Sequence, residues 1–162
     1  MNSWSQKEIR INSILEYAKE HMKSIQGTDF LSFIQELYKN ASPEDLEIKL
    51  DELYAIALNN WKFIARNNQS GSKIRIFNPT LEEHGWTSSH TIVQILSVDM
   101  PFLLDSITSN LLEDGNALHM LMHPVIEIRR DESGNIVSKG GKKITESIMH
   151  IEITAMSNQV DI

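Results

Sequence analysis

The spacing of apolar residues changes near residue 70, and this change restricts the folds that the chain can adopt. From Ile11 to Ile64, apolar residues recur at intervals of three and four, which is the spacing of an amphipathic helix. After residue 72 they tend to alternate, as in a half-buried strand. The residues between, 67–72, are polar and small and are typical of a connection. The pattern therefore predicts an α+β protein with a helical segment over residues 1–70 and a sheet-containing domain over residues 71–162.

Three helices are predicted in the first segment. The first ends near Gly27, and its buried stripe consists of Ile11, Ile14, Leu15, Ala18, Met22 and Ile25. The second begins at Thr28 or Asp29, because either side chain can accept a hydrogen bond from the free amides of a helix start, and its stripe consists of Phe30, Phe33, Ile34 and Leu37. The third begins at Ser42, where a hydroxyl cap is followed by proline and two acids, and its stripe consists of Leu46, Leu50, Leu53, Ala57, Trp61 and Ile64.

The second segment shows four strand patterns and one helix. Strands are predicted over residues 73–77, 90–96 and 119–129, the third with a proline at position 124, and a final strand is centred on residues 149–153. A helix opens at Pro101 and closes at Gly115, which is suited to a left-handed cap. From residue 90, the order strand, helix, strand, strand has one helix fewer than a split β-α-β unit. We therefore expect a fragment of something longer, in which one face of the sheet is half covered.

Composition and charge exclude several classes of function. The 162 residues are enough for one ordinary domain or two small ones. Fifteen Lys and Arg against 22 Asp and Glu give a net charge of −7, which repels phosphate backbones and anionic lipid, so we expect no nucleic-acid and no membrane partner. The absence of cysteine excludes disulfides, thiolate nucleophiles and cysteine-bound zinc. Without a signal peptide or an apolar stretch long enough to span a bilayer, the expected location is the cytoplasm.

The histidines of the strand patterns are candidate metal ligands. His119 and His123 are four residues apart, which on a strand separates them by about 13 Å, too far for one ion, so no metal site is predicted. If the third and last strands pair, one sheet face could carry His123, Glu127, His150 and Glu152. A polar outer face or a subunit contact is favoured there over a pH sensor.

Other motifs also favour structure over chemistry. Gly140 and Gly141 precede two lysines, but the earlier glycine of a phosphate-binding loop is missing, so a basic hairpin tip is expected. The run Glu82-Glu83-His84 has no nucleophile in register and is expected in a solvated turn. No glycine-rich dinucleotide fingerprint occurs. We predict no catalytic residue and no cofactor site in this segment.

One loop is a candidate ligand site. It joins a buried strand to a helix start, where free amides and the positive end of the helix dipole suit a carboxylate. The candidate ligand-binding residues are Asp99, Met100, Pro101, Phe102 and Leu103, together with Asn116 if a partner surface folds back over the far end of the helix. The structural alternative, a capped helix start with Phe102 in the core, is favoured over a ligand site.

Several runs of residues resemble a known family. The stretches 77–86, 90–93, 99–107 and 123–125 resemble the amino-terminal region of the large bacterial NAD-dependent glutamate dehydrogenases, and residues 51–54 and 60–63 are similar to its helical segment. The resemblance implies an ACT-like (ferredoxin-like) antiparallel sheet with a packed helix, truncated here before its second helix. In many ligand-binding ACT modules a glycine follows the Asp-x-Pro of the loop, whereas this chain has Phe102. That departure favours a role in packing or subunit assembly at least as much as amino-acid binding.

The resemblance implies a role in a larger enzyme. The parent would convert glutamate to 2-oxoglutarate and ammonia with NAD, in glutamate catabolism, and this segment would be a non-catalytic regulatory or assembly part of it. Its expected partners are the rest of the parent polypeptide, further copies in a homo-oligomer, and an amino-acid effector. Two alternatives stay open, a stand-alone amino-acid sensor using the loop and a module whose helical half docks a partner protein.

Overall fold

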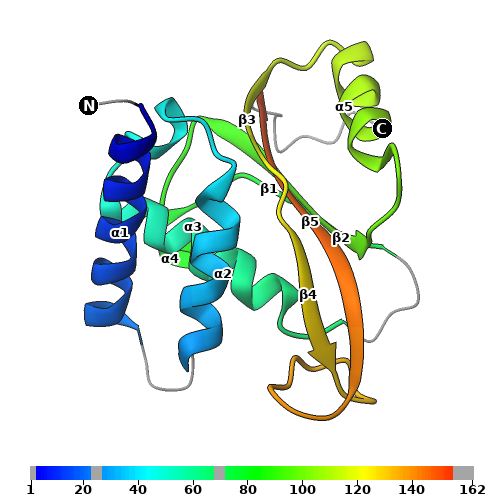
Figure 1. The fold of residues 1–162 in the computed structure, drawn as a ribbon. Coiled ribbons are helices and arrows are strands. Elements are labelled where there is room, and N and C mark those ends of the chain that lie inside the picture. The colour runs from blue at the N-terminus through cyan, green and yellow to red at the C-terminus, as the bar shows by residue number, and fades with distance from the viewer. Residues whose placement is uncertain (1–2, 23–26, 68–71, 155–162) are drawn as a thin grey trace.

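An antiparallel sheet separates the helical first segment from a single helix of the second (Figure 1). The computed structural model describes residues 3–22, 27–67 and 72–154. The helices are α1 (Ser3–His21), α2 (Gly27–Lys39), the 3₁₀ turn η1 (Glu44–Leu46), α3 (Leu50–Ile64), α4 (Leu81–His84) and α5 (Leu103–Glu113). The strands are β1 (Lys73–Phe77), β2 (His90–Val98), β3 (Leu118–Met122), β4 (Val125–Arg130) and β5 (Lys142–Thr154). None of the described helices is long and apolar enough to cross a membrane.

The sheet is organised around β5, its longest strand. The hydrogen-bonded order is β1-β2-β5, and β3 and β4 lie one after the other along the remaining edge of β5. The predicted single strand over 119–129 is therefore two strands, separated at His123 and Pro124. Proline has no amide to donate, although its carbonyl still accepts the amide of Ile148 at 3.0 Å. The other three predicted strands are confirmed, with the last extended at both ends.

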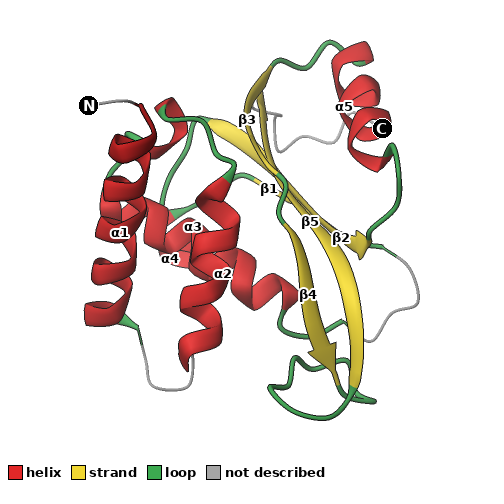
Figure 2. Ribbon diagram, viewed as in Figure 1, coloured by secondary structure: helices red, strands yellow, loops and turns green. Residues whose placement is uncertain are grey.

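The two faces of the sheet pack against different helices (Figure 2). Even-numbered residues of β2 and β5, such as Ile92, Leu96 and Ile148, join one core with α1, α2 and α3. Odd-numbered residues pack against α5 and comprise Val93, Ile95, Met149, Ile151 and Ile153. Side chains alternate along a strand, so even-numbered residues face the helical segment and odd-numbered residues face α5. The helical segment and the sheet thus share a core. The predicted domain boundary near residue 70 lies outside the described residues and stays a prediction.

The helix boundaries differ from those predicted in four places, the fourth being α5, which begins at Leu103 and not at Pro101. The first helix ends at His21 instead of Gly27, and Ile25 of its stripe lies outside the described residues. Gly27 instead begins α2, so Thr28 and Asp29 lie within its first turn and not at its cap. The Ser42 hydroxyl does accept the amide of Asp45 at 3.2 Å, as expected of a cap.

That cap at Ser42 starts only the single 3₁₀ turn η1, and the third α-helix begins eight residues after it, at Leu50. The cause is Lys49, whose extended backbone (ψ 149°) interrupts the helix and forms the true N-cap position of α3. The cap at Ser42 was therefore predicted correctly, but a cap does not determine how long the following helix is.

The boundaries of α5 follow backbone conformation. Pro101 lies in a turn before the helix, and Phe102, with φ of 63°, occupies the N-cap position in the left-handed region. At the other end, Gly115 has φ of 81°, as predicted for a left-handed cap. The amides of Gly115 and Asn116 bond the carbonyls of Leu112 and Leu111, which is the Schellman pattern.

The order β2, α5, β3 with β4, and β5 is an ACT-like α+β arrangement, which confirms the predicted fold class. β1 forms the outer edge beside β2. Its Ile74 and Ile76 pair with Ile95 and Val93, on the face that α5 covers, yet they are 60% and 59% exposed. No residue of α5 is fully buried. The α5 face of the sheet is therefore only partly covered by the described residues.

Candidate functional site

The predicted ligand loop is an exposed turn at the start of α5. Val98, Asp99, Met100, Pro101 and Phe102 are all exposed, and Phe102 is 78% exposed. The prediction that the phenyl ring lies in the core is therefore wrong. The backbone at this residue adopts the left-handed conformation, which costs an ordinary residue about 1–2 kcal/mol.

Polar side chains of the neighbouring strands lie beside this loop. Nε2 of His123 lies 2.6 Å from Oγ of Ser147, and Ser147 is directly opposite Ser97 in the pairing of β2 with β5. Ser97 is 2% exposed, and its hydroxyl has no hydrogen-bond partner among the described residues. A buried hydroxyl without a partner is costly. This hydroxyl could therefore bond a small polar ligand without breaking an existing bond.

Asp99 of the loop interacts both with His123 and with the main chain of β5. Burial of the imidazole lowers the pKa of His123, and the negative charge of Asp99 opposes this effect in part. The amide of Asp99 also donates to the carbonyl of Thr145 at 3.3 Å, which attaches the loop to β5. A carboxylate, an imidazole and two hydroxyls thus surround the end of β2.

Asn116 lies away from this group. Its Nδ2 donates to the carbonyl of Leu111 at 3.1 Å, at the C-terminal end of α5. The helix has 11 residues, so its two ends are about 16 Å apart. The structure does not bring Asn116 to the other five predicted residues, and its part in a ligand site stays a prediction.

The predicted shared face of four polar residues is wrong. Glu127 pairs with Thr145, and Met122 pairs with His150, so odd-numbered residues of β4 and even-numbered residues of β5 point to opposite faces. His150 and Glu152 face the helical segment and are 0% and 5% exposed, so they do not form a polar outer face. The register between the strands determines which residues of β4 and β5 share a face. The alternation within a single strand does not contain this information.

His150 and Glu152 instead belong to a buried polar network that joins α3 to the sheet. Asn60 donates to the carbonyl of Ile56 at 2.9 Å, and its Nδ2 lies 3.0 Å from Nδ1 of His150. Gln94 of β2 donates to Oδ1 of Asn59 at 2.7 Å and to Oδ1 of Asn60 at 3.2 Å. The sequence signal for this network is the presence of amide side chains inside two apolar stretches, Asn59 and Asn60 in the third helix and Gln94 in β2.

The carboxylate of Glu152 completes this network. Its two oxygens lie 3.4 Å from ring nitrogens of His90 and His150. Burial alone would raise the pKa of Glu152, but hydrogen bonds and charges from the two histidines together lower it. The imidazole of His90 also stacks on that of His119, with ring centroids 3.9 Å apart. Within the described residues, no group of three or more His, Asp and Glu side chains is placed to hold a metal ion.

The remaining predicted motifs have structural positions. His84 ends the short helix α4, is 9% exposed and stacks on Phe77 with centroids 4.4 Å apart, so it does not lie in a solvated turn as expected. Gly140 and Gly141 both have positive φ and end the connection between β4 and β5. Lys142 and Lys143 already pair with Arg130 and Arg129 in the ladder, so this run lies at the base of the hairpin and not, as was expected, at its tip.

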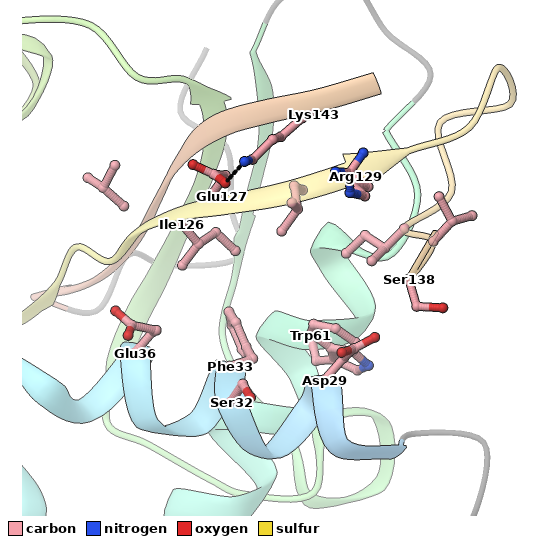
Figure 3. Close-up of a pocket in the computed structure, with 14 residues that line it drawn as sticks. Asp29, Ser32, Phe33, Glu36, Trp61, Ile126, Glu127, Arg129, Ser138 and Lys143 are labelled. Atoms are coloured by element: carbon pink, nitrogen blue, oxygen red, sulfur yellow. Dashed lines mark ion pairs between the residues drawn. The ribbon is translucent and has the colours of Figure 1, made fainter. Parts of the chain in front are cut away.

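A groove between α2 and β4 is a feature that the sequence did not reveal. It has a volume of about 500 Å³. Apolar side chains form much of its surface: Phe33, Trp61, Val125, Ile126, Ile128, Ile136 and Val137. Asp29, Ser32 and Glu36 point toward it from α2, whereas Glu127 and Lys143, on the far side of the strand, form an ion pair of 2.6 Å (Figure 3). The groove is open and carries charge on both sides.

The sheet, the packed helix α5 and the exposed loop between them define an ACT-like module with a helical layer on its second face. Residues 33–162 match the family described as glutamate dehydrogenase, ACT1 domain. The chain belongs to this glutamate dehydrogenase family, which confirms the resemblance seen in the sequence.

Two curated relatives, both named NAD-specific glutamate dehydrogenase, agree with this assignment. The protein of Halomonas elongata is 32% identical over 169 aligned positions, which cover 98% of this chain and 10% of the relative. That of Pseudomonas aeruginosa is 34% identical over 128 positions, which cover 75% of this chain and 8% of the relative. The chain thus spans about a tenth of the length of these relatives. No solved structure matches the chain significantly.

Proposed function

We propose that this chain is the amino-terminal regulatory or assembly segment of an NAD-dependent glutamate dehydrogenase. In this proposal the parent oxidises glutamate to 2-oxoglutarate and ammonia with NAD in the cytoplasm, and its cofactor and catalytic residues lie outside this segment. The segment contacts the rest of the polypeptide and further copies in a homo-oligomer.

The observation that carries this proposal is the uncovered strip on the α5 face of the sheet. Ile74 and Ile76 are more than half exposed, on the same sheet face as α5, a helix that buries none of its residues fully. Apolar surface of this kind on an ordered sheet is typical of an interface. A long enzyme of which this chain is about a tenth offers many elements that could cover it.

A chimeric enzyme tests the proposal. The matching segment of the Halomonas elongata protein is replaced by this chain, with or without the paired changes Ile74→Lys and Ile76→Lys. We expect the unchanged chimera to assemble and to reduce NAD with glutamate, and the double variant to lose assembly. Leu81→Lys is the control, because Leu81 is 70% exposed and lies on α4. Glutamate-dependent NAD reduction by the isolated 162-residue chain would overturn the proposed division of labour.

A second candidate is an amino-acid sensor at the loop before α5. The unpartnered Ser97 hydroxyl favours it, because that buried group lies beside Ser147, which contacts His123. Calorimetry with the twenty common amino acids is the test. Saturable binding that is abolished by Asp99→Ala, but not by Asp105→Ala on the exposed face of α5, would support a sensor. If none of the twenty amino acids binds, this candidate is excluded and the assembly role remains.

A further inference from the structure

The outer edge of β4 is open. Among the described residues, β4 forms a continuous ladder with β5 alone, and its outer edge carries one isolated bridge, between Arg130 and Ile136. The bond from the Ile148 amide to the Pro124 carbonyl shows that even-numbered residues along this stretch direct their main-chain groups toward β5. In an antiparallel ladder such directions alternate. The main-chain groups of Val125 and Glu127 therefore point outward.

Within the part of the chain that the structure describes, only the far end of this edge is occupied. The carbonyl of Arg129 accepts the amide of Val137 at 2.9 Å, which confirms that odd-numbered residues face outward and covers that position. The stretch from Val125 to Glu127 is left as an open edge, next to the groove between β4 and α2. Open strand edges pair readily with further strands.

The groove supplies a place for the side chains of such a strand. Trp61 and Ile128 are partly exposed at its apolar surface, and Val125 is 42% exposed. Its opposite wall is the acidic side of α2, where Asp29 and Glu36 are exposed (Figure 3). Neither carboxylate forms an ion pair among the described residues. An inward-facing lysine could extend its stem over the apolar surface and place its ammonium beside these acids.

The spacing of the acids fits an extended segment. Asp29 and Glu36 are seven residues apart on a helix, which is about 10 Å along its axis. Two side chains four residues apart on a strand lie on the same face and are separated by about 13 Å. Flexible lysine stems can accommodate the difference, and the residue midway between them would face the apolar surface that Phe33 and Trp61 form, with ring centroids 5.3 Å apart (Figure 3).

A second copy of this chain fits the edge poorly. Symmetric antiparallel pairing centred on Glu127 would place that carboxylate opposite its own copy, and like charges directly opposite each other destabilise a sheet. Each copy would also bring another α2 carrying Asp29 and Glu36. The groove is also lined by Arg129 and by Lys143, which pairs with Glu127. The two acids of α2 that form no ion pair among the described residues therefore outnumber Arg129, and the balance of charge favours a different, basic segment.

We propose that the open edge of β4 binds an extended, basic segment of a partner protein by strand addition. The segment pairs with the main chain of Val125 and Glu127 and places an apolar side chain against the surface of Phe33 and Trp61. It directs two lysines, four residues apart, at Asp29 and Glu36. This mode of recognition combines main-chain bonds for affinity with side-chain contacts for specificity.

The test uses the full chain and the peptide acetyl-Thr-Lys-Thr-Val-Thr-Lys-Thr-amide, with a twin in which glutamate replaces both lysines. We expect the basic peptide to bind at least about tenfold more tightly than the acidic twin, because the basic peptide gains two exposed ion pairs and the twin meets two like-charge contacts instead. Hydrogen exchange should show added protection of the Val125 and Glu127 amides. Equal affinity for the two peptides, or protection confined to other residues, would overturn the proposal.

Charge reversal on α2 gives a sharper comparison. The double variant Asp29→Lys and Glu36→Lys should prefer the acidic twin, and both sites are exposed, so folding should be unaffected. The matched control is Asp105→Lys with Glu113→Lys, which makes the same change in charge on exposed positions of α5. The control should keep the wild-type preference. Loss of preference in both variants, or self-association that protects the same amides, would also refute the proposal.

Discussion

Replacing Arg130 tests how the helical segment is attached to the sheet. The guanidinium is 4% exposed and donates four hydrogen bonds. Nε and Nη2 reach Oε1 of Glu146 at 3.0 and 2.7 Å, and Nη1 and Nη2 each reach a carbonyl at 2.8 Å, those of Gly134 and Ile64. One side chain thus links β4 to β5, to the hairpin loop and to the last residue of α3.

The variant Arg130→Met should strongly destabilise the protein. It leaves the carboxylate of Glu146, 2% exposed, without its counter-ion, and removal of one partner from a buried pair costs about 3–5 kcal/mol. We expect a loss of about 4 kcal/mol in the free energy of unfolding, measured by urea denaturation. At about 2–4 °C per kcal/mol for a chain of this size, the melting temperature should fall by roughly 10 °C or more.

A double variant separates the cost of the unpaired charge from the cost of the lost hydrogen bonds. Arg130→Met combined with Glu146→Leu removes the unpaired charge, so only the two carbonyls lose a donor. We expect the double variant to be destabilised by about 1–2 kcal/mol, and therefore to be more stable than the single variant. If both variants lose the same stability, the unpaired charge is not the cause.

The surface pair of Lys143 with Glu127 is the matched control. Its two side chains are each 58% exposed, and exposed pairs contribute about 1 kcal/mol or less. Lys143→Met should therefore change the free energy of unfolding by less than about 1 kcal/mol. If Arg130→Met costs no more than this control, the argument from burial is refuted.

Three further predictions concern backbone strain and acid stability. Phe102→Gly should raise the free energy of unfolding by about 0.5–1 kcal/mol, because relief of the left-handed strain exceeds the entropic cost of glycine; a loss in urea denaturation would contradict this. Gly141→Ala should cost about 3 kcal/mol, since its Cβ would lie 2.3 Å from the Arg130 carbonyl oxygen, whereas Gly140→Ala, in open space, should cost about 1 kcal/mol; equal melting temperatures would contradict the close approach. The pKa of Glu152 is held below its ordinary value of 4.5, so its carboxylate stabilises the fold above that pH and this contribution is lost as pH falls through the folded pKa. Glu152→Gln should flatten the acid limb of the stability profile, and an unchanged slope would count against that role.

Elements set by local spacing were predicted well. The alternation over residues 73–77 and the continuous apolar run from His90 correspond to β1 and β2. Gly115 was predicted as a left-handed cap because only its own backbone conformation was needed. The family resemblance, which rests on short runs of residues, was confirmed as well.

Features that depend on distant parts of the chain were not predicted. Ser42 caps a turn as expected, but the extended backbone of Lys49, beyond the reach of that cap, delays α3 until Leu50. Phe102 was expected in the core and is exposed, because the turn before α5 directs it outward. The open edge of β4 becomes visible only when its pairing with β5 is known.

The sequence by itself determined that helices precede a sheet, which residues alternate along each strand, and to which family the chain belongs. These properties depend on neighbours within a few positions, or on the identity of residues alone. Only the tertiary structure decided which face each alternating set occupies, because shifting a strand by one residue exchanges its two faces. That choice buries His150 and Glu152 on the face that packs on the helical segment and leaves Ile74 and Ile76 exposed on the face that α5 partly covers. It also forms the groove where β4 meets α2.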